Sequence, residues 1–191
     1  MQCDLDCRLS NFVWMKALKP VIFVVPIFAL IIVIILYINS LKKVTDRRQF
    51  KQFILILIVF AFLLNFAWET IQMPLFKAMK NDIQSTVFCA LATVADVIMV
   101  LLLYFGFAVM HKDPIWIQDL KGQRILALIL FGGVGAIFAE LRHLKAGTWS
   151  YSQSMPIMPF VKVGLSPVLQ FMVLPTLIYY LSFLKRKRIL K

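Results

Sequence analysis

Apolar residues in this chain gather in five long stretches, which short polar and basic segments separate. A helix that crosses the hydrocarbon core of a bilayer, about 30 Å thick, needs about 20 predominantly apolar residues. Five stretches come near that length: residues 20–41, 52–72, 83–110, 125–139 and 163–184. The pattern predicts an all-α fold, a polytopic bundle of five membrane-spanning helices. We expect residues 1–191 to form a single transmembrane domain with a basic tail at 185–191.

The first and fourth stretches need separate arguments. The first is too long for the apolar core of a signal peptide and no small-residue cleavage site follows it, so we expect a retained span. The fourth has only 15 residues before Glu140. If the fourth stretch did not cross, the C-terminus would lie on the other side of the membrane. Pro26, Pro167 and Pro175 are expected to bend the first and fifth helices.

The composition excludes other classes of protein. Hydrophobic residues make up 61% of the chain and charged residues 16%, against roughly 45–50% apolar and about 25% charged residues in soluble domains. A soluble domain of 22.0 kDa could not bury that much apolar surface in one core. Disordered chains are poor in large apolar residues, whereas this one has 17 Phe. An integral membrane protein remains.

The net charge of +12 is better explained by membrane topology than by nucleic-acid binding. Lys and Arg accumulate on the cytoplasmic side of membrane proteins. With five spans, the first and third connections and the C-terminal tail share one side and carry 13 basic residues, whereas the opposite side carries 8. We therefore expect a multi-pass protein of the cell inner membrane with its N-terminus outside and its C-terminus cytoplasmic. No nucleic-acid partner is expected.

Asp96 lies near the middle of the third stretch, 13 positions after Ile83 and 14 before Met110. By insertion scales an Asp at the centre of a membrane helix costs roughly 2.5–3.5 kcal/mol, and such residues usually face the bundle interior and often mark function. Asp96 is therefore a candidate catalytic residue. The alternative is a structural contact, in which a protonated Asp96 bonds to a neighbouring helix.

Glu69 ends the second stretch on a polar helical face. Asn65, Glu69 and Gln72 have the spacing i, i+4 and i+7, which places them on one side of a helix. A face toward lipid would not be polar, so this one is expected to look into protein or a water-filled cavity. The alternative is a Glu69 that lies at the outer interface and is simply solvated.

Glu140 ends the fourth stretch and opens the longest connection, which holds several polar and aromatic residues. Because the second and fourth spans end on the same side, one outward-facing pocket could collect side chains from both: Glu69, Gln72, Glu140, Arg142, His143, Trp149 and Tyr151. Asp96 would form the floor of this pocket. Arg142 could keep Glu140 ionised or bind an anionic head group, and the alternative is an ordinary exposed ion pair.

A small-residue face in the fourth stretch favours close helix packing, within the subunit or between subunits. Its members are Gly132, Gly133, Gly135 and Ala136. This face is not a dinucleotide-binding fingerprint, because no strand precedes it and the spacing is wrong.

No metal or other cofactor is expected. His111 and His143 lie on opposite sides of the predicted membrane, which argues against a bis-His haem or a His-based metal site. Cys3 and Cys7 could pair if the N-terminal tail is outside, and Cys89 is expected to be a small packing residue. No C-x-x-C pair is present.

Three segments carry a resemblance to known proteins: NFAWETIQMPLF at 65–76, ELRHLKAGTWSYSQSMPIMP at 140–159 and GLSPVLQF at 164–171. Together they resemble small uncharacterised multi-pass bacterial membrane proteins. The general pattern is also similar to integral-membrane isoprenoid enzymes of the lycopene cyclase and carotenoid hydratase groups, in which membrane-embedded acids are thought to protonate a polyene. The resemblance implies Glu69 and Glu140 as candidate acids.

Three functions remain open. The first is an acid/base enzyme acting on a lipid or isoprenoid. In it Glu69 or Asp96 would protonate an alkene and Glu140 would take the proton back. Trp68, Trp149 and Tyr151 would stabilise the carbocation through their ring faces. The second is a non-catalytic assembly or scaffold subunit, and the third a component of a proton-coupled transporter. Membrane lipids are the expected partners, with a homo-oligomer or partner subunit possible.

Overall fold

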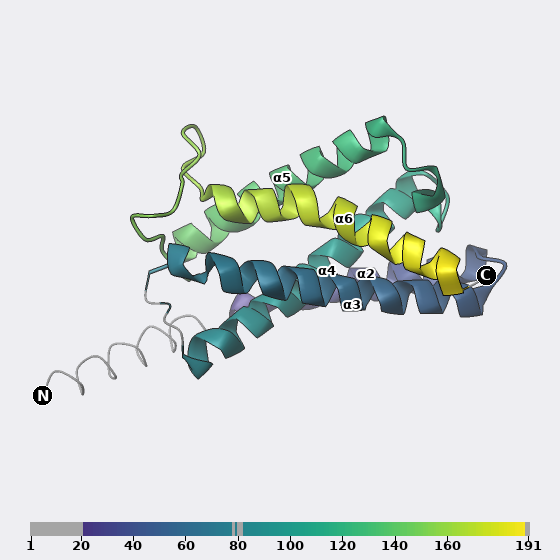
Figure 1. Ribbon diagram of the computed structural model, residues 1–191, viewed down its shortest axis with the longest axis horizontal. Coiled ribbons are helices and arrows are strands. Elements are labelled where there is room, and N and C mark those ends of the chain that lie inside the picture. Colours follow the sequence, from purple (N-terminus) through teal and green to yellow (C-terminus); the bar gives the residue numbers. More distant parts are fainter. Residues whose placement is uncertain (1–20, 78, 80–81, 190–191) are drawn as a thin grey trace, which may run out of the picture.

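Five long helices account for most of the described chain. The structure is a computed structural model that describes residues 21–77, 79 and 82–189. The helices are α2 (Val21–Lys43), α3 (Arg47–Gln72), α4 (Ile83–Met110), α5 (Gly122–Ala146) and α6 (Leu165–Ile189), with two short 3-10 helices, η1 (Met73–Leu75) and η2 (Trp116–Asp119) (Figure 1). Each long helix is apolar and long enough to cross a membrane. The predicted all-α bundle of five membrane-spanning helices is confirmed.

Local chemistry sets the helix ends. Asp46 caps α3 by accepting a hydrogen bond from the Gln49 amide at 2.9 Å, and Asp82 caps α4 through the Ser85 amide at 2.7 Å. These caps satisfy amide groups that have no partner within the helix. At the other end of α5, Gly147 adopts φ 65°, a left-handed conformation that favours glycine and stops the helix.

The fourth apolar stretch lies within a helix longer than itself. The helix α5 has 25 residues, beginning three residues before the stretch at 125–139 and ending seven after it. The apolar stretch is shorter because Arg124, Glu140 and Arg142 lie inside the helix and interrupt the hydropathy without interrupting the backbone.

The helices pack in a row that curls rather than in a closed ring. The central helix α3 packs against both α4 and α6, while α2 packs on the outer side of α4 and α5 packs on α6. The helices α4 and α5 hardly contact each other. The row therefore leaves a gap between α4 and α5, and side chains line that gap.

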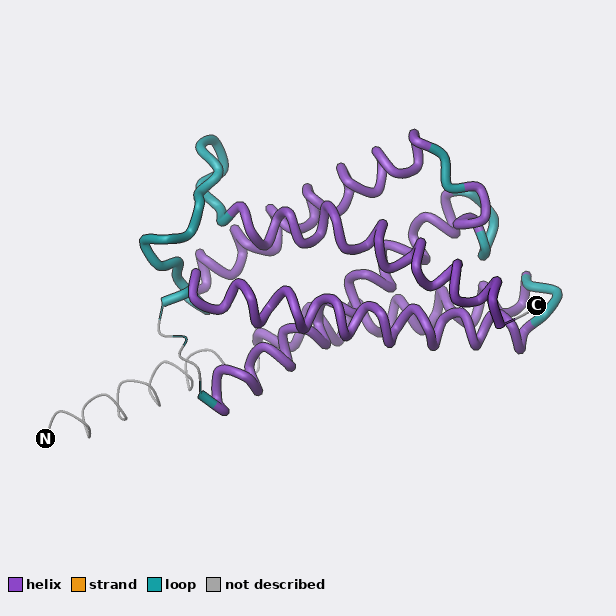
Figure 2. The backbone as a smooth tube through the Cα atoms, viewed as in Figure 1, coloured by secondary structure: helices purple, strands orange, loops and turns teal. Residues whose placement is uncertain are grey.

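The connections gather at two ends of the molecule (Figure 2). One end holds the turn between α2 and α3, the η2 segment between α4 and α5, and the end of α6 (Figure 1). The opposite end holds η1 and the loop between α5 and α6. The three segments in which basic residues are concentrated thus share one end.

Aromatic side chains pack tightly near the basic end. Tyr104, Trp116 and Tyr179 are fully buried, with ring centroids 5.5–5.8 Å apart in each pair. The Tyr179 hydroxyl donates to the Val100 carbonyl at 2.6 Å, and the Trp116 indole N–H donates to the Tyr104 carbonyl at 3.1 Å. Because the polar atoms of these rings are satisfied, η2 is held against α4 and α6 as part of the core.

The small-residue face of α5 meets α6 within the same chain. A Cβ atom at Gly132 would overlap the carbonyl oxygen of Phe171, so only glycine fits there. Gly133 faces the Met172 side chain, and Ala136 is buried beside Val168. Close packing within the subunit therefore accounts for Gly132, Gly133 and Ala136, whereas a Cβ atom at Gly135 would meet nothing within 4 Å.

Some sequence predictions fall on residues that the structure does not describe. Cys3 and Cys7, with the possible pairing between them, lie outside the described residues, as do the basic residues of the N-terminal tail. The assignment of residues 1–191 to one domain stays a prediction.

Candidate functional site

A network of amide and carboxyl groups joins three helices inside the membrane-spanning region. Gln170 of α6 donates to the Asn65 side-chain oxygen of α3 at 3.0 Å and to the Asp96 carboxyl of α4 at 3.0 Å. Gln72 of α3 donates to Glu69 at 2.8 Å and to the Gln170 side-chain oxygen at 3.2 Å. Ser166 donates to the Gln72 side-chain oxygen at 2.9 Å. Gln170 is therefore the link between α3, α4 and α6.

Helical periodicity places these side chains together. On α3, Asn65, Glu69 and Gln72 share the face predicted from their spacing. On α6, Ser166 and Gln170 are four residues apart and meet that face. Asn65 and Gln170 are both buried, and Gln170 is only 1% exposed. Each polar group has a partner that offsets the cost of its removal from water.

The carboxyl groups of Glu69 and Asp96 lie within hydrogen-bonding reach of each other. Two carboxyl groups form such a bond only when one of them carries the proton. Both side chains are partly exposed, because they face the cavity described below. The two acids, on α3 and α4, are also linked through the amides of Gln72 and Gln170.

Glu140 of α5 is held by the loop that follows its own helix. It is 6% exposed and accepts hydrogen bonds from the Trp149 indole N–H at 3.3 Å and from the Tyr151 hydroxyl. Burial and the bond to Glu140 raise the pKa of Tyr151, so the phenol stays protonated and keeps donating. Glu140 is near enough for its charge to act on both Glu69 and Asp96.

The loop between α5 and α6 is hydrogen-bonded to η1 and to Lys77, in the segment that follows α3. The Lys77 amide donates to the Ser150 carbonyl at 2.8 Å, and the Ser152 amide donates to the Leu75 carbonyl at 2.9 Å. The ring of Phe76 lies 5.7 Å from that of Tyr151. These contacts fix Tyr151 in position, and Tyr151 in turn fixes Glu140.

His143 stacks on Trp149 beside this loop. Their ring centroids are 4.1 Å apart with an interplanar angle of 20°, and His143 Nδ1 lies 3.4 Å from the Thr148 hydroxyl. The stack orients the Trp149 indole toward Glu140.

Glu69, Asp96 and Glu140 all line one cavity of about 620 Å³. Its polar lining includes Glu69, Gln72, Asp96, Glu140 and Gln170, and most of the remaining lining is aliphatic or aromatic. Ligand sites in proteins are of this size and have this mixture of an apolar wall with a few convergent polar groups. The cavity lies in the gap between α4 and α5, and residues of α2, α3 and α6 complete its lining.

Most of the residues predicted for the site line this cavity. They are Glu69, Gln72, Asp96, Glu140, Arg142, His143 and Trp149. Tyr151 is not in the lining and acts on it through Glu140. Trp68 is not in the lining either: it packs against the main core, and its indole nitrogen is buried without a partner.

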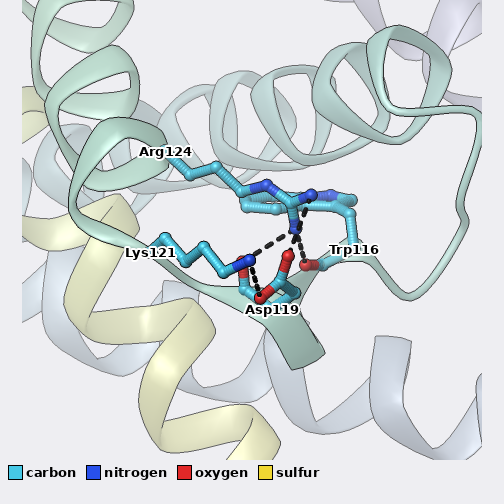
Figure 3. Close-up of polar contacts among 4 residues, drawn as sticks. All are labelled: Trp116, Asp119, Lys121 and Arg124. Atoms are coloured by element: carbon cyan, nitrogen blue, oxygen red, sulfur yellow. Dashed lines mark hydrogen bonds and ion pairs between the residues drawn. The ribbon is translucent and has the colours of Figure 1, made fainter.

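Arg142 is exposed on the cavity lining and does not pair with Glu140. Within the described part of the chain, the ion pairs are those that Asp119 makes with Lys121 at 3.2 Å and with Arg124 at 3.4 Å. They lie at the basic end, where Arg124 also donates to the Trp116 carbonyl at 2.8 Å (Figure 3). Glu140 takes neutral donors, Trp149 and Tyr151, in place of the expected cation.

Sequence reasoning missed Gln170 and Ser166. Neither is charged, so neither stands out in a hydropathy profile or in a search for intramembrane acids. Their signal is the i, i+4 pair of hydrogen-bonding side chains in the first, largely apolar turns of α6. That pair matches the polar face of α3 and could have identified the contact between α3 and α6.

Among the described residues, no three His, Cys, Asp or Glu side chains gather as a metal-binding group. Comparison of the chain with protein-family models, with curated proteins and with solved structures finds no match. The resemblance to isoprenoid enzymes therefore stays a prediction. The structure therefore describes an integral membrane protein with five candidate spans, in which Glu140 is buried beside a largely apolar cavity.

Proposed function

We propose that this protein is an acid/base enzyme that acts on a lipid or isoprenoid inside the membrane. The observation that carries the proposal is the convergence of Glu69, Asp96 and Glu140, from three different helices, on one largely apolar cavity. A carboxylic acid in an apolar environment can remain protonated at neutral pH and serve as a general acid. An apolar wall admits a hydrocarbon substrate.

The reaction class that suits this arrangement is proton-initiated rearrangement of an alkene. The Glu69–Asp96 pair donates its proton to one alkene carbon, and the electron pair of the double bond forms the new C–H bond. The neighbouring carbon becomes a carbocation. Glu140 then takes a proton from a carbon next to the cation, and that C–H electron pair forms a new double bond. The net result is movement of the double bond, an isomerisation that requires no oxidant or reductant.

Two further groups support these steps. The Trp149 ring lines the cavity beside Glu140, where its face could stabilise a passing cation. Gln170 donates to Asp96 and so positions its carboxyl group while leaving it free to exchange the proton. Tyr151 holds Glu140 as a neutral donor. Trp68 lies away from the cavity and has no part in this mechanism.

The test compares membrane lipids from cells that express the wild type, Glu69→Gln, Asp96→Asn or Glu140→Gln. These substitutions keep the size of each side chain and remove the exchangeable proton. We expect mass spectrometry to find a lipid that wild-type protein alters and that each variant leaves unaltered. Asp119→Asn is the matched control, since this acid lies outside the cavity. Identical lipid profiles for the wild type, all three variants and a deletion strain would refute the proposal.

A proton-coupled transporter component is the second candidate, because the shared proton of Glu69 and Asp96 suits a relay as well as an acid. Proteoliposomes with an internal pH dye separate the two functions. Proton flux that Asp96→Asn abolishes, in a protein that leaves lipids unaltered, would favour the transporter.

We also propose that the protein is a multi-pass protein of the cell inner membrane, with the basic end cytoplasmic. The segments rich in Lys and Arg share one end of the bundle, which supports this orientation. The test replaces all three native cysteines by Ser and then places a single cysteine at Gln153 or at Lys112, both of which are exposed. An impermeant maleimide added to intact spheroplasts should label position 153 alone. Labelling of position 112 alone would reverse the orientation.

A further inference from the structure

The cavity extends well beyond the acids. Its lining follows α4 from Phe88 past Asp96 to Met110. At 1.5 Å per residue, Asp96 and Met110 are about 21 Å apart along the helix axis. That distance is roughly two thirds of a hydrocarbon core about 30 Å thick. The site is therefore a channel with a polar end at the acids and a long apolar end.

The channel opens toward the bilayer along its side. Leu91 and Phe131 both line it, and they are 44% and 58% exposed on the apolar surface of the helices. Side chains that belong to the cavity and to the outer surface at once mark its rim. The rim is apolar at these two residues, and charged at Arg142 near the acid end, so its apolar part is suited to face lipid.

Glycines keep the channel wide. Gly106 of α4 and Gly135 of α5 line it, and a Cβ atom at either position would meet nothing within 4 Å. Gly132, three residues earlier on α5, has no such space because it packs on α6. The glycines at 106 and 135 are thus not explained by helix packing.

Two phenylalanines narrow the channel shortly before its lining ends at Met110. The rings of Phe107 and Phe131 meet edge to face, with centroids 5.8 Å apart and an interplanar angle of 89°. This contact joins α4 to α5 on the side of the acids that lies toward the basic end, and both rings belong to the cavity lining. An apolar chain that enters from the acid end meets this contact before it reaches the end of the lining.

The charge of the lining restricts the polar end of the occupant. The channel contains three carboxyl groups, while Arg142 is the cation in the described lining and is exposed. An anionic head group among the carboxyl groups would be repelled where the dielectric constant is low. The amides of Gln72 and Gln170 are buried and already bonded to the carboxyl groups and to each other, so they supply no positive charge to offset this repulsion. A neutral head group, such as a hydroxyl, suits this end instead.

We propose that Gly106, Gly135 and Phe131 determine substrate specificity by setting the width and length of the channel, and that its occupant is a neutral lipid with a single apolar chain. The two glycines leave room for the chain, and Phe131 limits how far it extends. The inference rests on the proposed function only in taking the occupant to be the substrate.

The experiment measures binding, so its outcome does not depend on catalysis. Purified protein in nanodiscs is titrated with geraniol, farnesol, geranylgeraniol and solanesol, neutral alcohols of increasing chain length, and quenching of tryptophan fluorescence reports binding. We expect affinity to rise up to geranylgeraniol and to gain nothing for solanesol. Farnesoic acid should bind about tenfold more weakly than farnesol.

Substitutions test the three residues separately. Gly135→Phe and Gly106→Phe, on different helices, should each weaken geranylgeraniol binding about tenfold, whereas Gly122→Phe, at another glycine with open space but outside the cavity, should not. Phe131→Ala should allow solanesol to bind more tightly than geranylgeraniol. Its control is Phe138→Ala, an exposed α5 residue outside the lining. Gel filtration checks that each variant is folded. If Gly135→Phe does not fold, the smaller substitution Gly135→Leu takes its place.

The results separate this inference from the proposed function. One outcome is that binding depends on chain length and the glycine and Phe131 variants shift this dependence, while the membrane lipids of cells stay unaltered. That outcome would support the proposed channel and contradict the proposed enzymatic function. Equal binding of all four alcohols, or binding that Gly135→Phe and Gly106→Phe leave unchanged, would overturn the inference. So would farnesoic acid binding as tightly as farnesol.

Discussion

Replacing Gln170 by Met tests whether the amide network stabilises the helix row. Met has a similar length, so the change removes hydrogen bonds with little change in packing. Gln170 loses its bonds to Asn65, Asp96 and Gln72, which span 3.0–3.2 Å. In membrane proteins such bonds average about 0.6 kcal/mol and reach about 1.7 kcal/mol. Three of them predict a loss of about 2 kcal/mol in the free energy of unfolding, with an upper limit of about 5 kcal/mol.

The assay is equilibrium unfolding in mixed micelles, with SDS as the denaturant and far-ultraviolet circular dichroism as the signal. Ser182→Ala is the matched control, because Ser182 is also buried on α6 but donates only to the Ile178 carbonyl of its own helix, at 2.6 Å. We expect Ser182→Ala to cost less than about 1 kcal/mol. If both variants unfold at the same SDS fraction as each other, Gln170 is not the link between α3, α4 and α6.

Three further predictions concern packing, protonation and surface charge. Gly132→Ala should lower the free energy of unfolding by about 1–3 kcal/mol because its Cβ collides with α6, whereas Gly135→Ala in open space should be neutral or stabilising in the same SDS titration. The pKa of Tyr151 is raised in the folded protein, so its hydroxyl contributes fully to the free energy of unfolding below about pH 10, the ordinary Tyr value, and this contribution is lost as the pH rises toward the folded pKa. The difference in free energy of unfolding between wild type and Tyr151→Phe should therefore shrink above about pH 10. A difference that stays constant with pH would contradict this reasoning. Asp119→Asn should cost no more than about 1 kcal/mol, because the ion pairs of Asp119 are exposed, and thermal unfolding at low and high salt would measure it.

The amino-acid sequence alone predicted the membrane-spanning helices and the meeting of Glu69 and Glu140 at one end of the bundle. Hydropathy identifies helices that must satisfy their own backbone in lipid, and that constraint does not depend on their neighbours. Five alternating spans place the ends of α3 and α5 on one side of the membrane. Glu69 and Glu140 therefore had to meet near the same end, and the helical face of Glu69 fixed its direction.

The lateral order of the helices could not be read in the same way. Nothing in the hydropathy distinguishes a helix at the centre of a row from one at its edge, so the gap between α4 and α5 was not predictable. The position of Trp68 shows a different limit. It is adjacent to Glu69 in the sequence, but consecutive residues lie about 100° apart around a helix. Its side chain therefore turns toward the main core.

The apolar rim of the cavity changes how any occupant is supplied. A molecule that reaches the site through the lipid-facing side never has to dissolve in water. Occupancy then follows the mole fraction of that molecule among the surrounding lipids, and adding more detergent dilutes it even when the bulk concentration stays constant. Affinities for this protein are best expressed per lipid, and binding that is lost on solubilisation should return when the protein is placed in a bilayer again.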